Sequence, residues 1–507
     1  MFSSVSSAIL QGLGVEFVQI EVDINQGLPS FQMVGYLSSE VKEAGERVRT
    51  AIRNAGFELP TKKIIVNLSP ADIRKKGTIF DLGIAVAIMA ALEELPEERK
   101  KGILLAGELS LDGSVKGVKG ILPIVYAAEK EGYRCCIIPK ENEREGALVS
   151  NIEVVGVSHL REAYEYIRGE RKRTSKKELK GMQYEQEQGD DFSEIHGQAL
   201  AKRAVEIAVA GGHNILMVGP PGAGKTAIAK RIPSILPPMS LEESMEVTML
   251  YSIVGELDLQ RPLRTKRPFR EVHATMTKTG LLGGGIYPKP GEISLAHKGV
   301  LFLDEIAEFP RATMESLRKP LEDRMVKIVR EKGECSFPAE TLLVAAMNPC
   351  PCGNYPDLSK CTCTPSQREM YMKKLSAPFL ERIDICVEVP KVQYEELATE
   401  RKEESSEMIR KRIVQARKIQ GERYQGLGFA TNACLDMKHI EGYCILGSRE
   451  QVLMKQAYEH LGLSARTYHK VLLVARTIAD LEGSERIEER HLQEALGYRT
   501  MDERNRR

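Results

Sequence analysis

The most informative segment of the sequence is Gly219-Pro220-Pro221-Gly222-Ala223-Gly224-Lys225-Thr226. An apolar run typical of a buried strand (214–218) precedes it, and a helical pattern (227–231) follows. In this context a G-x-x-x-x-G-K-T pattern binds phosphate, because glycines let successive N–H groups converge on the phosphate oxygens and the helix dipole adds positive charge. The stretch predicts an ATP site on an α/β core. We expect Lys225 to reach the β- and γ-phosphates and Thr226 to hold Mg²⁺.

A second motif lies further along the chain, at Val300-Leu301-Phe302-Leu303-Asp304-Glu305. Its four apolar residues predict a buried strand that delivers two carboxylates at its end. We expect Asp304 to bind the Mg²⁺ shell and Glu305 to polarise the attacking water. Together with Lys225, this motif strengthens the prediction of an ATPase.

Composition sets the broad class of the protein. The 507 residues are too many for one core, and 42% hydrophobic and 28% charged residues are typical of a soluble globular protein. A net charge of +1 gives no overall basic surface that would indicate nucleic-acid binding, although it is compatible with a local basic patch. We see no signal-peptide pattern at the N-terminus and no apolar run long enough for a membrane helix. Ten cysteines are too few for a disulfide scaffold. We therefore expect a cytoplasmic protein with reduced thiols.

Changes of pattern divide the chain into four parts. Residues 1–168 mix strand patterns with a long Ala-rich helix pattern (82–95) and predict an α/β or α+β domain. Residues 169–190 are basic and then acidic, which is typical of a solvated linker; a DNA-binding or nuclear-localisation segment is the alternative. Residues 191–393 again read as α/β, and residues 394–507 as almost purely helical. An α/β core followed by a helical lid is typical of AAA+ ATPases.

Three further segments point to one family. Residues 66–72, 191–198 and 346–353 resemble the Mg-chelatase-like YifB/ComM family, and the resemblance covers nearly the whole chain. It implies a ring-forming, hexameric AAA+ ATPase whose ComM-like members act as DNA helicases and promote branch migration in natural transformation. The partner that it implies is single-stranded or branched DNA.

The same resemblance assigns three more site residues. Asn348, at the end of a strand pattern, resembles sensor 1, which orients the lytic water. Arg382 lies in a segment that resembles the one carrying the arginine finger, so it would reach the γ-phosphate of a neighbouring subunit. Arg466 resembles sensor 2 and would contact phosphate in its own subunit. For both arginines a surface salt bridge is the alternative.

Two segments are candidates for contact with DNA. Residues 275–292 are rich in Gly and Pro and predict a mobile loop, with Lys278 and Lys289 for phosphates and Tyr287 for stacking on bases. Residues 324–338 predict a basic hairpin that carries Arg324, Lys327, Arg330 and Lys332. The alternatives are a loop packed on its own subunit and a solvated hairpin.

The N-terminal part resembles the proteolytic domain of Lon at residues 107–113 and 139–143. The resemblance places Asp81 at the position of the nucleophilic serine and Leu122 at that of the activating lysine. Because neither group can do this chemistry, we expect no peptidase activity. The domain would remain as a scaffold for oligomerisation or DNA contact.

Four cysteines, Cys350, Cys352, Cys361 and Cys363, lie close together in the sequence. A structural zinc site, an unmetallated loop and a redox switch are the alternatives. Four protein ligands leave no open position for catalytic zinc. The remaining six cysteines are predicted to be small core residues.

Three functions remain open from the sequence. The first is a motor that remodels DNA. The second is a chelatase-type ATPase that drives metal insertion into a tetrapyrrole, against which the Lon-like domain counts. The third is an ATP-driven protein remodeller.

Overall fold

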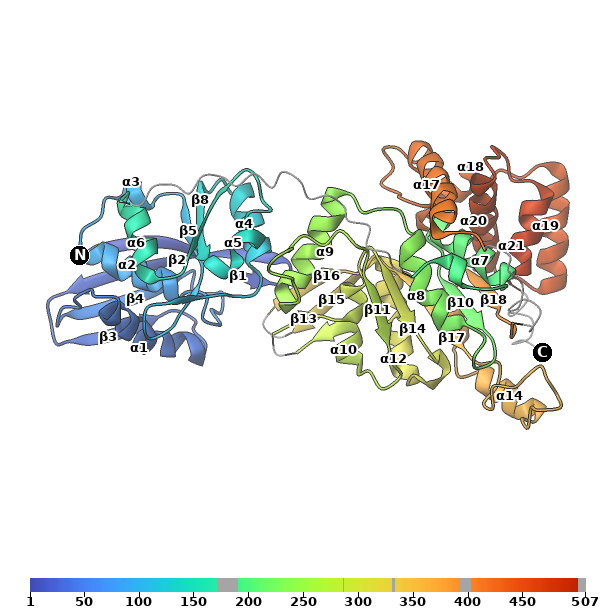
Figure 1. The fold of residues 1–507 in the computed structure, drawn as a ribbon, viewed down its shortest axis with the longest axis horizontal. Coiled ribbons are helices and arrows are strands. Elements are labelled where there is room, and N and C mark those ends of the chain that lie inside the picture. Colours follow the sequence, from blue (N-terminus) through green and yellow to red (C-terminus); the bar gives the residue numbers. More distant parts are fainter. Residues whose placement is uncertain (171–189, 286, 331–332, 393–402, 500–507) are drawn as a thin grey trace. The chain divides into compact units, whose positions relative to one another are not determined.

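The computed structural model describes residues 1–170, 190–285, 287–330, 333–392 and 403–499 (Figure 1). The chain divides into two compact units. Unit 1 comprises Met1–Tyr184, Leu241–Arg264 and Lys327–Phe337, and unit 2 comprises Glu185–Ser240, Thr265–Val326 and Pro338–Arg507. None of the helices in the described part of the chain is long and apolar enough to cross a membrane. Residues 171–189 of the predicted linker lie outside the described residues.

Unit 1 is built on a seven-stranded mixed sheet in the order β3-β4-β2-β1-β5-β8-β9. Its antiparallel pairs join β1 to β2 and β2 to β4, while the other neighbours are parallel. The strand patterns within residues 1–168 include residues 17–22 and 63–68, which lie in β2 and β4. The strands are β1 (Phe2–Gln11), β2 (Gly14–Asn25), β3 (Ser30–Val34), β4 (Lys63–Ser69), β5 (Ile103–Leu105), β8 (Cys135–Pro139) and β9 (Glu153–Val157).

One helix forms the core of unit 1. In α2 (Asp81–Leu92) every residue from 81 to 91 is buried, as expected for a helix that is apolar all round. It packs on β1 and β2 and contacts α1 and α6. The other elements are α1 (Ser39–Asn54), α3 (Glu97–Lys100), β6 (Glu108–Leu109), β7 (Val115–Lys116), α4 (Ile121–Lys130), α5 (Glu143–Gly146) and α6 (Leu160–Arg168).

Two segments from the middle of the chain also belong to unit 1. Helix α9 (Leu241–Val254) packs on α4, and the Gly120 N–H donates to the carbonyl of Ser252 at 3.1 Å. The hairpin of β15 (Met325–Arg330) and β16 (Gly333–Pro338) lies against the β1–β2 turn. There a Cβ at Gly12, whose φ is +66°, would lie 3.0 Å from Cβ of Cys335. The sequence did not predict that these segments pack within the N-terminal unit.

Unit 2 contains a five-stranded parallel sheet in the order β11-β14-β17-β10-β18. The three central strands are wholly buried, and their sequences are accordingly continuous runs of apolar residues. Their carboxyl ends lie at one edge of the sheet, where parallel α/β folds place ligands. The strands are β10 (Ile215–Val218), β11 (Phe269–Val272), β14 (Val300–Leu303), β17 (Leu342–Met347) and β18 (Ile385–Glu388).

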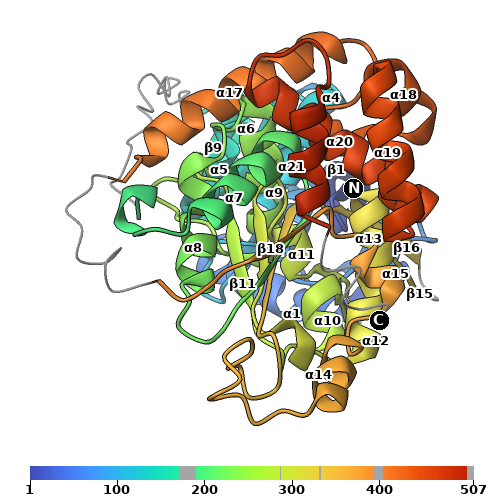
Figure 2. The same cartoon turned by 90° about the vertical axis from the view of Figure 1, so that its right-hand side faces the viewer.

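Helices complete unit 2, which confirms the predicted α/β class with a helical C-terminal region. Helices α17 and α20 pack on α7, and α20 lies beside α21 (Figure 2). Within this part, buried Asp480 pairs with Arg423 at 2.5 Å and Arg476 at 3.0 Å. The helices are α7 (Ala199–Gly211), α8 (Lys225–Ile235), α12 (Arg311–Ser316), α13 (Arg318–Asp323), α14 (Pro365–Met372), α15 (Ala377–Leu380), α17 (Ser406–Arg423), α18 (Met437–Tyr443), α19 (Ser448–Leu461), α20 (Ala465–Leu481) and α21 (Glu489–Gly497).

Candidate nucleotide site

The glycine-rich loop joins β10 to α8, as the sequence predicts. Gly224, immediately before α8, has φ +90°, a left-handed conformation that favours glycine. A Cβ at Gly219 would lie 2.1 Å from the carbonyl oxygen of Val389, so only glycine fits there. The loop therefore takes a conformation that side chains would block, and it leads into the positive end of an 11-residue helix.

Lys225 lies at the base of this loop and is only 8% exposed. Its Nζ donates to the carbonyl of Gly219 at 2.5 Å, to that of Pro220 at 3.0 Å and to Asn348 Oδ1 at 3.2 Å. Burial lowers the pKa of Lys225, while the nearby carboxylates of Asp304 and Glu305 oppose that shift. Lys225 thus links the loop to the end of the neighbouring strand β17.

The carboxylates of the second motif lie opposite the loop. Thr226 Oγ1 donates to Asp304 Oδ2 at 2.9 Å, which brings together two oxygen ligands of the kind that Mg²⁺ prefers. The Glu305 N–H donates to Asp304 Oδ1 at 2.9 Å. Glu305 has φ +49°, an uncommon conformation for a residue other than glycine. Such outliers cluster at functional sites.

These residues form one pocket. It holds the loop, both carboxylates and Asn348, so the structure brings together most of the residues that the sequence assigns to the site. Gly219 and Pro220 contribute through their carbonyl groups, which hold Lys225. Ala227 and Met347 are lining residues that the sequence did not single out. The lining residues are Pro221, Gly222, Ala223, Gly224, Lys225, Thr226, Ala227, Asp304, Glu305, Met347 and Asn348.

The two predicted arginines do not line this pocket. Arg382 is 8% exposed and lies 2.6 Å from Glu322, a residue that the sequence analysis missed. Arg466, at the start of α20, pairs with the same Glu322 carboxylate. Burial acts to raise the pKa of Glu322, but hydrogen bonds from Arg466 and Arg382 hold it below its usual range. Arg382 and Arg466 therefore form one cluster around Glu322.

The Gly- and Pro-rich insert has more structure than a mobile loop. It contains α10 (Lys278–Leu282), the ribbon of β12 (Gly283–Gly284) and β13 (Lys289–Pro290), and the start of α11 (Glu292–Leu295). Thr277 caps α10 by accepting from the Gly280 N–H, and Leu281 is fully buried. A Cβ at Gly291 would lie 2.2 Å from the backbone nitrogen of Gly283, so these glycines permit close packing.

The candidate DNA-contacting side chains lie in different places. Lys278 and Lys289 are exposed on the insert, and Tyr287 is half-buried. In the second segment the predicted hairpin is present, with Lys327 exposed and Arg324 lying 3.8 Å from Glu340. Lys332 and the side chain of Arg330 lie outside the described residues.

At the Lon-like positions, both side chains are buried within unit 1. Asp81 accepts from Arg47 at 3.0 and 3.1 Å. Burial raises the pKa of Asp81 to about 6, although Arg47 opposes the shift. Leu122 is fully buried in an apolar cluster. An ion-paired carboxyl and a leucine supply neither a serine nucleophile nor a lysine base.

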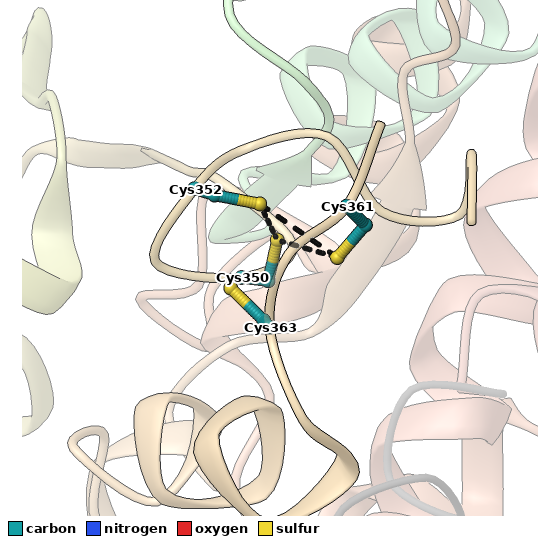
Figure 3. A group of neighbouring side chains, drawn as sticks. All are labelled: Cys350, Cys352, Cys361 and Cys363. Carbon is teal, nitrogen blue, oxygen red and sulfur yellow. Dashed lines mark hydrogen bonds between the residues drawn. The ribbon is translucent and has the colours of Figure 1, made fainter. Parts of the chain in front are cut away.

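The four neighbouring cysteines converge after β17, with their side chains pointing toward one another (Figure 3). The sulfur of Cys350 lies 3.5 Å from that of Cys352 and 3.8 Å from that of Cys361, and the last two are 3.7 Å apart. With Cys363 included, all four sulfurs lie within 4.8 Å of one another. Among the described residues, this is the one group of three or more His, Cys, Asp or Glu side chains close enough together to hold a metal ion.

Comparison with known proteins agrees with this architecture. Family descriptions match three regions: "Subunit ChlI of Mg-chelatase" at residues 20–142, "Magnesium chelatase, subunit ChlI" at 191–397 and the ChlI C-terminal region at 403–499. The chain is 41% identical to YifB of Escherichia coli over 97% of the chain and 96% of that protein. It is 41% identical to competence protein ComM of Haemophilus influenzae, over 98% and 97%. Lon protease 2 of Bacillus subtilis matches 25% of the chain at 29% identity and is covered over 23% of its length.

Proposed function

Because the chain belongs to the magnesium chelatase ChlI-type family of AAA+ ATPases, we propose that it is an ATP-driven DNA helicase of the ComM kind. The observation that carries the ATPase part is the pocket in which the glycine-rich loop meets Asp304, Glu305 and Asn348. The DNA part rests on 41% identity to a competence protein over almost the whole chain. In this proposal the protein acts in the cytoplasm and supports integration of DNA during transformation or recombination.

Within the pocket each residue has a distinct task. Lys225 leaves the loop carbonyl groups to bind the β- and γ-phosphates of ATP. Thr226 and Asp304 hold Mg²⁺, which neutralises phosphate charge when bound. Glu305 polarises the attacking water, and Asn348 helps to orient it. The 3.2 Å contact between Asn348 and Lys225 supports this pairing of roles.

The arginine cluster is assigned to the boundary between subunits. Since Arg382 and Arg466 share Glu322 and do not line the pocket of their own chain, we place both against the nucleotide of a neighbouring subunit. For Arg466 this replaces the contact in its own subunit that the sequence suggests. Active sites completed in this way require an oligomer, and the family resemblance points to a hexameric ring.

The proposal gives DNA contact to exposed side chains and a structural role to the cysteines. Lys278 and Lys289 supply positive charge for phosphates, and Tyr287 supplies a ring for stacking. Lys327 on the hairpin is a further phosphate contact. Besides ATP and Mg²⁺, the protein would hold a structural zinc ion at its four neighbouring thiols.

Two other functions use the same ATPase. The family description names magnesium chelatase, which supports metal insertion into a tetrapyrrole, and the Lon-like region supports a protein remodeller. ATP turnover measured without DNA, with single-stranded DNA and with a forked duplex separates these from the DNA motor. We expect both DNA forms to raise turnover. Absence of both stimulation and DNA binding at low salt, where phosphate contacts are strongest, would rule out the DNA function.

A further inference from the structure

The spacing of the four thiols fits a single metal ion. Four sulfurs at about 2.3 Å from a tetrahedral zinc ion would lie about 3.8 Å from one another. The three distances among the sulfurs of Cys350, Cys352 and Cys361 are 3.5, 3.7 and 3.8 Å, which match this value and are far longer than a disulfide bond of about 2.05 Å. The sulfur of Cys363 lies within 4.8 Å of the other three.

The chain between the two cysteine pairs lacks a core of its own. From residue 351 to residue 360, Gly353 alone is buried. A surface segment that buries so little apolar area needs another source of stability, and a bound metal ion supplies one in small domains. The two pairs come from either end of this segment, so one ion would close it into a fixed loop.

This loop, defined as residues 350–363, touches the nucleotide pocket. Cys350 follows Asn348 by two residues at the end of β17, and its side chain is fully buried. At Gly353, whose φ is +77°, an added Cβ would lie 2.6 Å from Cδ of Pro221, which lines the pocket. The loop backbone thus packs directly on the phosphate-binding loop.

A second connection runs through α14, which begins two residues after Cys363. Thr364 caps this helix by accepting from the Gln367 N–H at 3.2 Å. Burial raises the pKa of Tyr371 on α14, while the neighbouring backbone of Asn348 opposes that shift, so the buried ring lies beside Asn348. The cysteine loop is therefore joined to Asn348 from both of its ends.

We infer that these four cysteines bind one zinc ion, and that the ion fixes Asn348 and Pro221 in the positions that ATP hydrolysis requires. The inference rests on the proposed ATPase function for its catalytic consequence. The metal takes no part in the chemistry, because its four protein ligands leave no open position. The ion acts by positioning. When zinc is absent, the 350–363 loop loosens, and the wall of the pocket that this loop supports loosens too.

The test starts with the metal content of the purified full chain. We expect one zinc per chain in the wild type and in a Cys434→Ser control, whose thiol lies outside the cluster. The double variant Cys352→Ser/Cys361→Ser should hold less than about a tenth of that amount, since two ligands are lost. Wild-type protein without zinc, or with iron in its place, overturns the zinc site.

The coupling is tested on wild-type protein, so that no variant has to fold. Zinc is removed with a chelator, and hydrogen exchange is followed at residues 219–226 and 342–352 before removal, after removal and after zinc is returned. We expect exchange at residues 219–226 to rise about tenfold without zinc and to recover when it is returned. Unchanged exchange there overturns the coupling.

ATP turnover supplies the catalytic readout. Zinc removal should lower kcat about tenfold or more, while the Kd of a fluorescent ATP analogue changes less than about threefold, because the carbonyls of Gly219 and Pro220, and not the cysteine loop, hold Lys225 and the loop remains mostly closed. Equal kcat with and without zinc contradicts the positioning role. If the wild-type protein with zinc does not hydrolyse ATP, the proposed function fails, and zinc content and hydrogen exchange still decide the inference.

Discussion

Replacement of Lys225 by alanine tests the nucleotide site. The ammonium group is almost buried and makes three contacts in the structure, two with loop carbonyls and one with Asn348. We expect it to exchange two of these for phosphate oxygens when ATP binds. Hydrogen bonds to charged groups contribute about 1.5–3 kcal/mol each, so the variant should lose about 3–6 kcal/mol of binding free energy. That corresponds to an increase in Kd of about 10²- to 10⁴-fold.

The assay is titration with a fluorescent ATP analogue in the presence of Mg²⁺. Lys225→Met, which keeps the apolar stem, should lose as much affinity as Lys225→Ala. The control is Lys230→Ala on the same helix, whose side chain is 46% exposed and lies 3.1 Å from Glu271. Exposed ion pairs contribute about 0–1 kcal/mol, so this control should keep its affinity within about fivefold. A folded Lys225→Ala protein that binds the analogue within about threefold of the wild type would refute the assignment.

Three further predictions follow from other residues. Glu305→Gln should bind ATP normally but hydrolyse it about 10²- to 10⁴-fold more slowly, whereas the control Glu308→Gln should retain ATP turnover. Normal ATP turnover by Glu305→Gln would show that Glu305 does not polarise the attacking water. Mixed with wild-type subunits, Arg382→Ala should lower ATP turnover more than in proportion to its share, and a proportional loss would argue against shared sites. Burial lowers the pKa of His213 from 6.5 to about 4, so between these values the unfolded chain binds a proton that the folded chain does not. The free energy of unfolding should therefore fall by about 3 kcal/mol as pH drops through this window. Denaturant titrations at several pH values should show that His213→Gln weakens this dependence of the unfolding free energy on pH. The control, His460→Gln at an exposed position, should preserve it.

Local patterns predicted the parts of the site that are close together in the sequence. The strand, glycine-rich loop and helix around Lys225 occur as expected, because periodicity and glycine placement specify them locally. The strand that ends at Asp304 was equally clear, since four apolar residues in a row favour a buried parallel strand. The functional role of Asn348 could be predicted only from the family resemblance, because an asparagine after a strand has no distinctive local pattern.

Contacts between distant residues were not predictable in the same way. Arg466 pairs with Glu322, which lies 144 residues away in the sequence, and no local sequence pattern at either residue predicts this ion pair. Packing of α9 on α4, and of the β15–β16 hairpin against the β1–β2 turn, also depends on residues far apart in the sequence. Glycine residues in the insert were predicted to make the segment mobile. In the structure, Gly283 and Gly291 instead permit close contact between backbone segments.

Strand displacement on a forked DNA duplex measures the proposed helicase activity itself. The wild-type protein should separate the strands when ATP and Mg²⁺ are present and should fail with a non-hydrolysable analogue. Glu305→Gln should bind the same fork without separating it, because it holds ATP but cannot complete the cycle. Strand separation by Glu305→Gln at the wild-type rate, or an active wild-type ATPase that never displaces a strand, would contradict an ATP-driven DNA helicase.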